Sequence, residues 1–308
     1  MGAMHKLVGT LMGNTFELSI AFEKEGLALQ YLNEAVEEIR RIEGLLTTFD
    51  ENSQTNLINR YAGISPVRVD EEVYNLIERS IKISELTQGA FDISYGAMDK
   101  RLWNFDLSMT TLPKKEVAAG SVHLINYKNI ILNKKNRTIF LKEKGMRIGF
   151  GGIGKGYAAE MAKAFLLKKG IKSGIVNAAG DLSTWGKQPN GDPFTIGIAD
   201  PQKADQLFSY LSISDLAVAT SGNYEKYVVI GGKRYSHTID PKTGYPVSGI
   251  KSVTTICPNA EIADAMATPI MVMGVHAGLH MINQIRHMAC IIVDDDNIIH
   301  TSRNIKLK

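Results

Sequence analysis

The stretch Gly149-Phe150-Gly151-Gly152-Ile153-Gly154-Lys155-Gly156 contains five glycines in eight residues and lies between a predicted strand and a predicted helix. A glycine-rich turn at a helix N-terminus exposes backbone N–H groups and adds the positive end of the helix dipole. Lys155 brings a positive charge to the same place. These features are typical of a phosphate or pyrophosphate site. The alternative is a tight turn with a solvated lysine, although five glycines are more than such a turn needs.

Two known nucleotide-binding patterns fit this stretch only in part. It satisfies G-x-G-x-x-G, but the first acidic residue beyond the next predicted strand is Asp181, too far along for the usual ribose contact. It satisfies most of G-x-x-x-x-G-K-[ST], but Gly156 stands where a hydroxyl has to meet magnesium. Neither a dinucleotide-binding fold nor a P-loop kinase is therefore favoured.

On both sides of the loop, strands and helices interleave without strict alternation. Apolar patterning predicts strands at 15–21, 138–141, 146–150, 171–176, 194–198, 215–220 and 251–257. Three-to-four spacing of apolar residues predicts helices at 32–46, 71–86, 156–169 and 263–273, with Gly170 as a C-terminal cap. Turns are expected at 178–181 and 240–244. This order favours an α+β fold over a doubly wound sheet.

Composition excludes several classes of function. The 308 residues are 44% hydrophobic and 22% charged, enough to bury one or two ordinary cores. A net charge of +3 without a dense Lys/Arg stripe does not indicate binding of nucleic acid. Cys257 and Cys290 each border an apolar run and are expected to be reduced core thiols. No stretch approaches about 18 consecutive apolar residues, so no transmembrane segment is expected.

The first four residues, Met-Gly-Ala-Met, are typical of a cloning remnant. No signal peptide or lipid-anchor cysteine precedes the first patterned segment. Two explanations stay open: a cytoplasmic protein, or a periplasmic or membrane-anchored lipoprotein whose export signal has been removed.

Asp264 and Thr268 are four residues apart in a predicted helix and therefore share one face. Their neighbours are small or apolar, so the carboxylate is expected to be buried, which is unfavourable unless it is paired or binds a metal. Two hard oxygen ligands at this spacing suit Mg²⁺. Equally compatible is a structural role in which Asp264 caps a backbone or pairs with an arginine while Thr268 bonds to its own helix.

His237 lies at the end of a predicted strand, beside the hydroxyls of Ser236 and Thr238 and before a strongly specified turn. It could act as a general base, or it could be a hydrogen-bonded structural residue, which is the more common role of an isolated histidine. The remaining histidines show no ligand spacing with a second soft donor, so zinc is not expected.

Five segments together resemble the FAD:protein FMN transferase family, also called ApbE. The family's Gly-Gly-Ile-Ala-Lys-Gly-Tyr motif corresponds to 151–157, and its Ala-Thr-Ser-Gly-(Asp/Asn)-Tyr motif corresponds to 219–224. Ser-His-x-x-Asp-Pro-x-Thr-Gly is found at 236–244, Ala-Asp-Ala-x-Ala-Thr at 263–268 and Gly-Ala-Phe-Asp at 89–92. The resemblance implies a single ApbE-like domain over 5–308, with an α+β fold of mixed sheets and flanking helices in two interleaved lobes.

The resemblance also implies a role for each candidate site residue. Asp264 and Thr268 would hold Mg²⁺ together with the main-chain carbonyl of Gly152, and Lys155 would bind the pyrophosphate of FAD with the loop amides. The residues expected to line the flavin are Met12, Thr48, Phe49, Asp50, Gly89, Ala90, Phe91 and Asp92. Those expected to contact the nucleotide portion are Asn177, Gly180 and Asp181, and those expected at the flavin or phosphates are Ser221 and Thr243.

This chain departs from the family pattern at two loop positions. The family usually has an acidic residue where Gly149 stands, so a carboxylate is missing beside the loop. It has alanine where Gly154 stands, and the change to glycine adds flexibility without an obvious loss because the loop acts through its backbone.

The activity implied by the resemblance is Mg²⁺-dependent transfer of FMN from FAD to a threonine or serine hydroxyl of an acceptor flavoprotein, with release of AMP. His237 would be the general base, since its ordinary pKa lies near neutrality. Two alternatives stay open. Water could replace the acceptor hydroxyl, which would make the protein an FAD pyrophosphatase, or the protein could be a non-catalytic FAD carrier.

Overall fold

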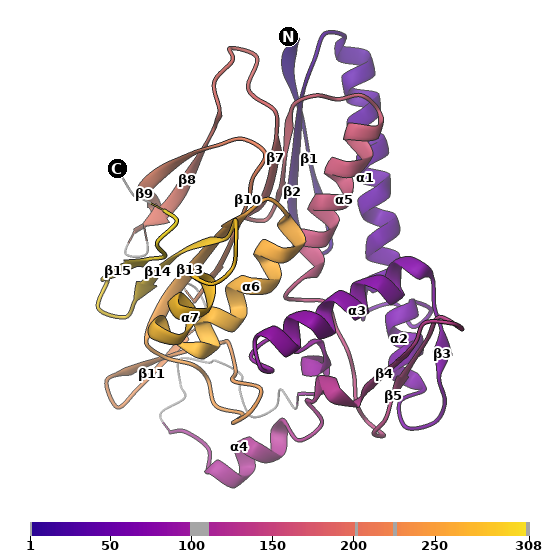
Figure 1. The fold of residues 1–308 in the computed structure, drawn as a ribbon, viewed down its shortest axis with the longest axis vertical. Coiled ribbons are helices and arrows are strands. Elements are labelled where there is room, and N and C mark those ends of the chain that lie inside the picture. Colours follow the sequence, from indigo (N-terminus) through magenta and orange to yellow (C-terminus); the bar gives the residue numbers. More distant parts are fainter. Residues whose placement is uncertain (1, 99–110, 201–202, 224–226, 306–308) are drawn as a thin grey trace.

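The computed structural model describes residues 2–98, 111–200, 203–223 and 227–305. Its centre is an eight-stranded sheet in which every neighbouring pair of strands is antiparallel (Figure 1). In spatial order the strands are β1 (Ala3–Leu11), β2 (Asn14–Phe22), β6 (Gly174–Ala178), β7 (Asp181–Trp185), β10 (Ala217–Gly222), β13 (Ile250–Cys257), β14 (Ala289–Asp294) and β15 (Ile299–Thr301). Alternate residues of a strand point to the same face of the sheet. In β2 these are Phe16, Leu18 and Ile20, which are fully buried and form the core-facing side of the strand.

Three helices cover one face of this sheet: α1 (Glu25–Leu46), α5 (Gly154–Lys168) and α6 (Ala260–Met273) (Figure 1). The predicted apolar stripe of α1 is the buried side of that helix, from Ala28 to Leu46. A shorter helix, α7 (Val275–Ile282), follows α6 and contacts β14.

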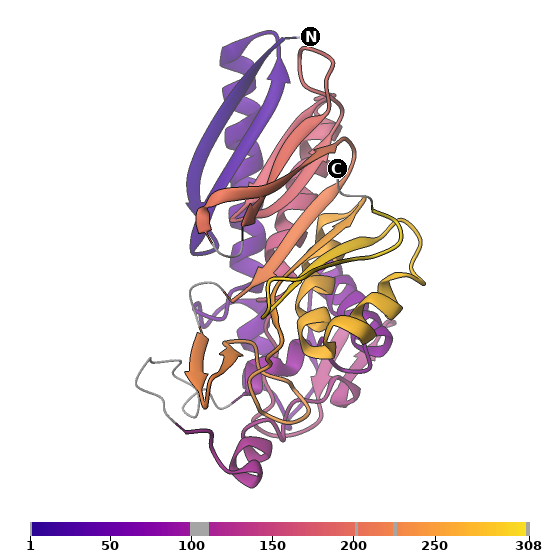
Figure 2. The same ribbon diagram turned by 90° about the vertical axis from the view of Figure 1, so that its left-hand side faces the viewer.

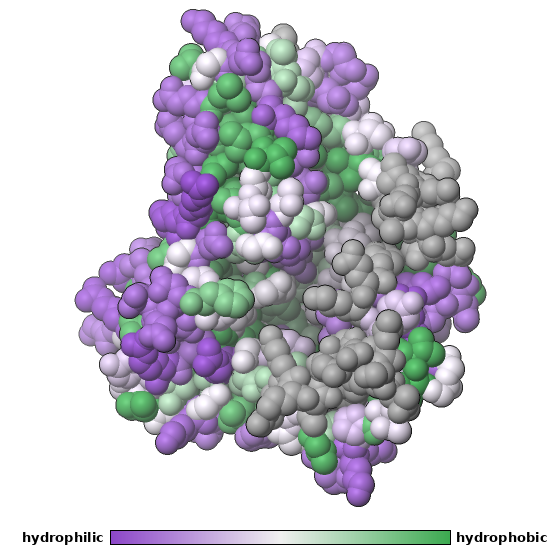
Figure 3. Space-filling view, turned by 180° about the vertical axis from the view of Figure 1, so that it is seen from behind, coloured by the Kyte–Doolittle hydropathy of each residue, from purple (hydrophilic) through white to green (hydrophobic). Residues whose placement is uncertain are grey.

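The other face of the sheet is partly covered by a two-stranded ribbon, β8 (Phe194–Asp200) and β9 (Lys203–Ile213) (Figure 2). Ile213 of the ribbon packs with Leu182, Val218 and Ile256 of the sheet in a small apolar cluster of its own. Figure 3 shows the molecule from behind, where apolar side chains gather in the upper half of the surface among hydrophilic ones.

The remaining elements lie below the large sheet in Figure 1. They are α2 (Gln54–Arg60), α3 (Glu71–Leu86), α4 (Lys115–Ser121), the 3₁₀ helices η1 (Ile93–Ala97) and η3 (Tyr127–Asn129), the small sheet of β3 (Val67–Arg68), β5 (Thr138–Leu141) and β4 (Ile130–Asn133), and the hairpin of β11 (Tyr227–Ile230) and β12 (Lys233–Ser236). One hydrophobic cluster joins α2, α3 and the small sheet to the large sheet, because it contains Leu76 and Ile77 of α3 as well as Leu18 of β2 and Ile292 of β14.

The predicted α+β class is confirmed, and so are most of the predicted elements. The helix at 71–86 begins and ends where the pattern places it, while α5 and α6 begin two and three residues before their predicted starts. Both cysteines are buried thiols outside any disulfide, as expected. Within the described ranges, no helix is long and apolar enough to span a bilayer.

The strand predicted at 146–150 is wrong. The segment is extended but joins no sheet. The side chain of Asn59 takes the place of a neighbouring strand: its Nδ2 donates to the Ile148 carbonyl at 3.0 Å, and its Oδ1 accepts the Ile148 N–H at 2.7 Å. Gly149 then donates to the carbonyl of Ile93 at 2.9 Å. The apolar pattern matches the burial of Met146, Ile148 and Phe150, but the partners of the segment are a side chain and a loop.

Candidate active site

A cavity of about 980 Å³ opens where the glycine loop meets α6. Its lining comes from the β1–β2 turn, the end of α1, the 90–96 segment, the loop at 147–152, the end of β10, the 237–241 segment and α6. Ligand cavities are commonly about 300–1,000 Å³, so this one is large enough for a dinucleotide.

The glycine loop brings backbone amides to this cavity. Ile153 is the N-cap of α5, and its apolar side chain cannot accept an N–H of the first turn. The turn itself is closed by the N–H groups of Ile153 and Gly154, which both donate to the Phe150 carbonyl. Gly151 and Gly152 remain exposed or partly exposed along the wall. This geometry favours an anionic group at the start of α5.

A close helix crossing sets the floor of the cavity. A Cβ atom added to Gly156 would lie 2.2 Å from the Ala260 carbonyl oxygen and 2.6 Å from Asp264 Cβ, so only glycine allows α5 and α6 to approach this closely. The same approach lets the Gly156 N–H donate to Oδ2 of Asp264 at 2.9 Å. The requirement for glycine here is steric and directly linked to the position of the carboxylate.

The start of α6 is fixed by two side chains that accept its first N–H groups. Asn259 caps the helix through its Oδ1, which accepts the Ile262 N–H at 3.0 Å. Glu160 of α5 accepts the Ala260 N–H at 2.9 Å. Together these bonds join the N-terminus of α6 to α5 and set the rotation of the helix about its axis.

An ion pair ties the same turn of α6 to α3. Arg79 of α3 binds Glu261 through two bonds of 2.6 and 2.9 Å, with the glutamate side chain 7% exposed. A two-bond pair of this kind fixes direction as well as distance. Asp264 follows one turn further along and is therefore held against the glycine loop.

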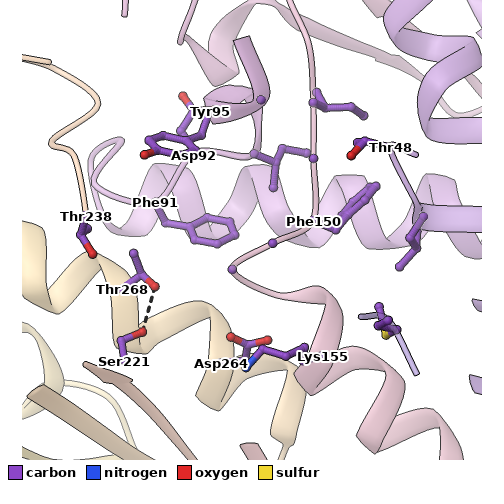
Figure 4. Close-up of a pocket in the computed structure, with 18 of the residues that line it drawn as sticks. Thr48, Phe91, Asp92, Tyr95, Phe150, Lys155, Ser221, Thr238, Asp264 and Thr268 are labelled. Carbon is purple, nitrogen blue, oxygen red and sulfur yellow. Dashed lines mark hydrogen bonds between the residues drawn. The ribbon is translucent and has the colours of Figure 1, made fainter. Parts of the chain in front are cut away.

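Three charged side chains meet at the floor of the cavity. Lys155 forms an ion pair with Asp181 of β7. Asp264 lies beside Lys155 (Figure 4). Burial, with a smaller contribution from the Asp181 carboxylate, raises the pKa of Asp264 to about 7, against the opposing effects of Lys155 and the Gly156 N–H. Burial also raises the pKa of Asp181, against the opposing effect of Lys155. One lysine therefore interacts with two buried carboxylates, so a further positive charge beside them would be electrostatically favourable.

Neutral oxygens lie next to this cluster. The Thr268 Oγ1 is 3.0 Å from the Ser221 Oγ on β10 (Figure 4). A Cβ atom added to Gly152 would lie 4.0 Å from Thr268 Oγ1, so the loop passes close to that hydroxyl. No group of three or more His, Cys, Asp or Glu side chains that could hold a metal occurs in the described part of the chain. The oxygens of Asp264, Thr268 and Gly152 suit a hard cation such as Mg²⁺.

Apolar and aromatic residues form the opposite side of the cavity. Phe91 and Phe150 lie across from Asp264 and Lys155 (Figure 4), and Met12 and Thr48 also contribute to the lining. Phe49 is 98% exposed at the rim. An aromatic side chain so fully exposed offers a surface for a planar ligand at the cavity mouth.

Asp92 contributes to the lining, but its carboxylate is engaged in the fold. It accepts the Ser94 N–H and hydroxyl at 2.8 and 2.6 Å, and the Tyr127 N–H at 2.7 Å. Burial raises its pKa, and these bonds oppose the rise. We infer that Asp92 fixes the position of its neighbour Phe91.

His237 is exposed and contributes to the cavity lining. The segment around it is fixed by backbone bonds: Ser236 donates to the Val247 carbonyl at 2.8 Å, and the Thr238 N–H donates to Ser236 Oγ at 3.1 Å. The histidine is thus held on the side of the cavity formed by the 237–241 segment.

Most predicted site residues meet in this cavity, and five do not contribute to its lining. Those five are Asp50, Gly89, Asn177, Gly180 and Thr243. The Asn177 side chain accepts the Gly180 N–H at 2.8 Å, which closes the β6–β7 turn. Thr243 donates to Asp240 at 3.0 Å within its own turn, and Gly89 lines a neighbouring cavity of about 370 Å³.

Several lining residues were not predicted from the sequence. Among them are Tyr95, Arg147, Thr220 and Thr238. Asn59, which holds the loop from outside the cavity, was not predicted either. Arg147 and Gly149 alternate with the buried Ile148, so an extended segment with alternating exposure was the available signal. Asn59 carries no such signal, because it is 89 residues from its partner.

Comparison with known proteins identifies the family of this chain. The sequence profile of the ApbE family matches residues 12–292. An FAD:protein FMN transferase of Klebsiella pneumoniae (strain 342) is 30% identical over 300 residues, covering 97% of this chain and 92% of the relative. A protein of the same name from Treponema pallidum is 28% identical and covers 89% of this chain and 80% of its own length.

Solved structures of ApbE proteins have the same fold as this chain. The ApbE protein of Thermotoga maritima superimposes with a TM-score of 0.86 at 32% identity, covering 98% of this chain and 97% of that one. The fold and the relatives define an enzyme of the transferase class. The chain belongs to the ApbE family.

Proposed function

We propose that this protein transfers FMN from FAD to a threonine or serine hydroxyl of an acceptor flavoprotein, in a Mg²⁺-dependent reaction that releases AMP. The observation that carries the proposal is the buried Asp264 carboxylate, fixed against a glycine-rich helix start inside a cavity of dinucleotide size. The names of the relatives support FAD as the substrate and a protein as the acceptor.

Asp264, Thr268 and the Gly152 carbonyl are the residues that would hold Mg²⁺. The raised pKa of Asp264 supports a cation at these residues. Burial disfavours the ionised carboxylate, and a bound cation would stabilise that ionised form. When bound, the metal supplies charge neutralisation at the pyrophosphate and at the departing AMP.

Lys155 and the amides of the glycine loop would bind the remaining charge of the pyrophosphate. The exposed or partly exposed backbone of Gly151 and Gly152 along the cavity wall supports this role. Lys155 is held near the loop by Asp181, so its ammonium group is positioned before substrate arrives. Phe91, Phe150 and Phe49 would contact the aromatic rings of FAD.

His237 would remove the proton from the acceptor hydroxyl. The hydroxyl oxygen then forms a bond to the FMN-side phosphorus, the bond from that phosphorus to the bridging oxygen breaks, and AMP leaves with the bridging oxygen. Exposure of His237 at the cavity supports this role, because an acceptor protein has to reach it from solvent. We further propose that residues 5–308 act as one domain in this reaction.

The proposal is tested by incubating the protein with FAD, Mg²⁺ and a candidate acceptor flavoprotein, and measuring AMP release with and without the acceptor. A transferase releases AMP in proportion to the flavin that becomes attached to the acceptor. AMP release that is independent of acceptor would instead indicate an FAD pyrophosphatase. FAD binding without any AMP would indicate a carrier.

A further inference from the structure

The hydrogen bond between Ser221 and Thr268 has two possible directions with different chemical consequences. Each hydroxyl carries one proton and two lone pairs. The oxygens are 3.0 Å apart, and the bond crosses from β10 to α6 within the cavity (Figure 4). Only one of the two protons can lie between them, so the other is directed elsewhere.

The Thr268 hydroxyl differs from the hydroxyls of Ser84 and Thr87 at the end of α3. Helical Ser and Thr commonly donate to the carbonyl four residues earlier. Ser84 and Thr87 at the end of α3 do so, with bonds of 3.0 and 2.8 Å to Ser80 and Ile83. Among the contacts that the described residues make, the hydroxyl of Thr268 is bonded to Ser221 instead.

We propose that Thr268 donates its proton to Ser221, and that Ser221 donates its own proton to an oxygen of bound FAD. This inference rests on the proposed function and deepens it. With the proton directed at Ser221, the lone pairs of Thr268 are available to a cation. Ser221 is thus a positioning residue for Thr268.

The charges of the cavity explain why this direction matters. Asp181 is engaged by Lys155, which leaves Asp264 as the neighbouring carboxylate for a cation. The other ligands are then neutral oxygens, whose attraction depends on the direction of their dipoles. In the reversed bond, the Ser221 proton would occupy one lone pair of Thr268, which would leave fewer lone pairs for a cation.

The test is a double-mutant cycle read by metal binding. Mn²⁺, which accepts the same oxygen ligands as Mg²⁺, is titrated by electron paramagnetic resonance without FAD. Loss of an outer partner of a metal ligand typically weakens binding about 10-fold or more, so Ser221→Ala is expected to weaken Mn²⁺ binding on this order. In a Thr268→Val background, the same change is expected to have no further effect. Additive losses, or unchanged affinity in Ser221→Ala, would overturn the proposal.

Two further variants keep the result interpretable. Ser221→Thr retains the hydroxyl and is expected to keep the wild-type affinity. Thr254→Val removes a matched hydroxyl pair, since Thr254 Oγ1 lies 2.9 Å from Thr220 Oγ1 on the neighbouring residue of β10, and is expected to leave affinity unchanged. If Ser221→Ala does not fold, Ser221→Cys replaces it, because a thiol is a weak acceptor.

Failure of this inference is distinguishable from failure of the proposed function. A wild-type protein that neither binds Mn²⁺ nor transfers FMN contradicts the proposed function. If the wild-type protein does both, but the losses of Mn²⁺ affinity in Ser221→Ala and Thr268→Val are additive, only the role of Ser221 is contradicted.

Discussion

Lys155 lies between two carboxylates, and its removal is expected to affect the pyrophosphate more than the flavin. Lys155→Ala deletes the positive charge and leaves Asp181 and Asp264 unbalanced beside the anion. A charge-assisted hydrogen bond contributes roughly 1.5–3 kcal/mol, so the dissociation constant of FAD is expected to rise about 10- to 100-fold. Isothermal titration of FAD and of riboflavin measures the effect. Equal weakening of both ligands would mean that Lys155 acts through folding.

The raised pKa of Asp264 predicts how metal binding depends on pH. Its folded pKa of about 7 is above the ordinary value of 3.8, so the native protein without metal holds this proton until near neutrality. Stability contributed by that proton is present at low pH and is lost as the pH rises from 3.8 through about 7. Mg²⁺ needs the ionised carboxylate, so its apparent affinity is expected to rise with pH, by at most about 10-fold per unit, and to level off above neutrality.

This pH dependence is measured by Mg²⁺ titration of FAD-dependent thermal stabilisation across the neutral range. Asp264→Asn is the matched variant, since it keeps the side-chain shape and cannot ionise. A wild-type affinity that stays constant from acid to neutral pH would contradict the assignment of Asp264 as the metal ligand.

His237 is expected to act on rate and not on binding. His237→Gln should leave FAD affinity nearly unchanged and lower single-turnover transfer on the order of 10²–10⁴-fold. A near-normal rate constant from saturating FAD would remove His237 from the mechanism.

The close packing of α5 against α6 determines where the Asp264 carboxylate lies. Gly156→Ala places a Cβ atom 2.2 Å from the Ala260 carbonyl oxygen, so the helices have to separate and Asp264 has to move. Overpacking of this kind costs about 1–3 kcal/mol, and metal affinity is expected to fall with it. Thermal unfolding and Mn²⁺ titration measure the two effects.

Gly154→Ala is the matched control, two residues away in the same helix turn. A Cβ atom there would be 3.4 Å from Phe150 Cβ and 3.5 Å from Met12 Cε, which are ordinary contacts. The variant is expected to fold and bind metal as the wild type does. Equal loss in both variants would show that the glycines act through loop flexibility and not through the helix crossing.

Elements and site residues differ in how far the sequence predicts them. The helix at 71–86 follows from its apolar spacing, and the shared face of Asp264 and Thr268 follows from the helical period. The pairing of Lys155 with Asp181 could not be predicted in this way, because it depends on how β6 and β7 fold back onto the start of α5. The partner of Ile148 is likewise set by tertiary packing.

Across the whole molecule, the cavity lies at the junction between the helix layer of the large sheet and the elements below it. The floor comes from α5, α6 and β10, while the aromatic side comes from segments at 90–96 and 147–150. One hydrophobic cluster holds both parts together. A ligand that spans the cavity therefore contacts both parts, and FAD with Mg²⁺ is expected to stabilise the whole fold.

Mass spectrometry of an acceptor flavoprotein tests the central claim most directly. After incubation with the protein, FAD and Mg²⁺, the intact acceptor is expected to gain the mass of one phosphoester-linked FMN, and peptide mapping is expected to place it on a threonine or serine. The gain should disappear with Asp264→Ala and when Mg²⁺ is chelated. An acceptor whose mass stays unchanged while FAD is consumed, or flavinylation that is equal with Asp264→Ala, would contradict the account.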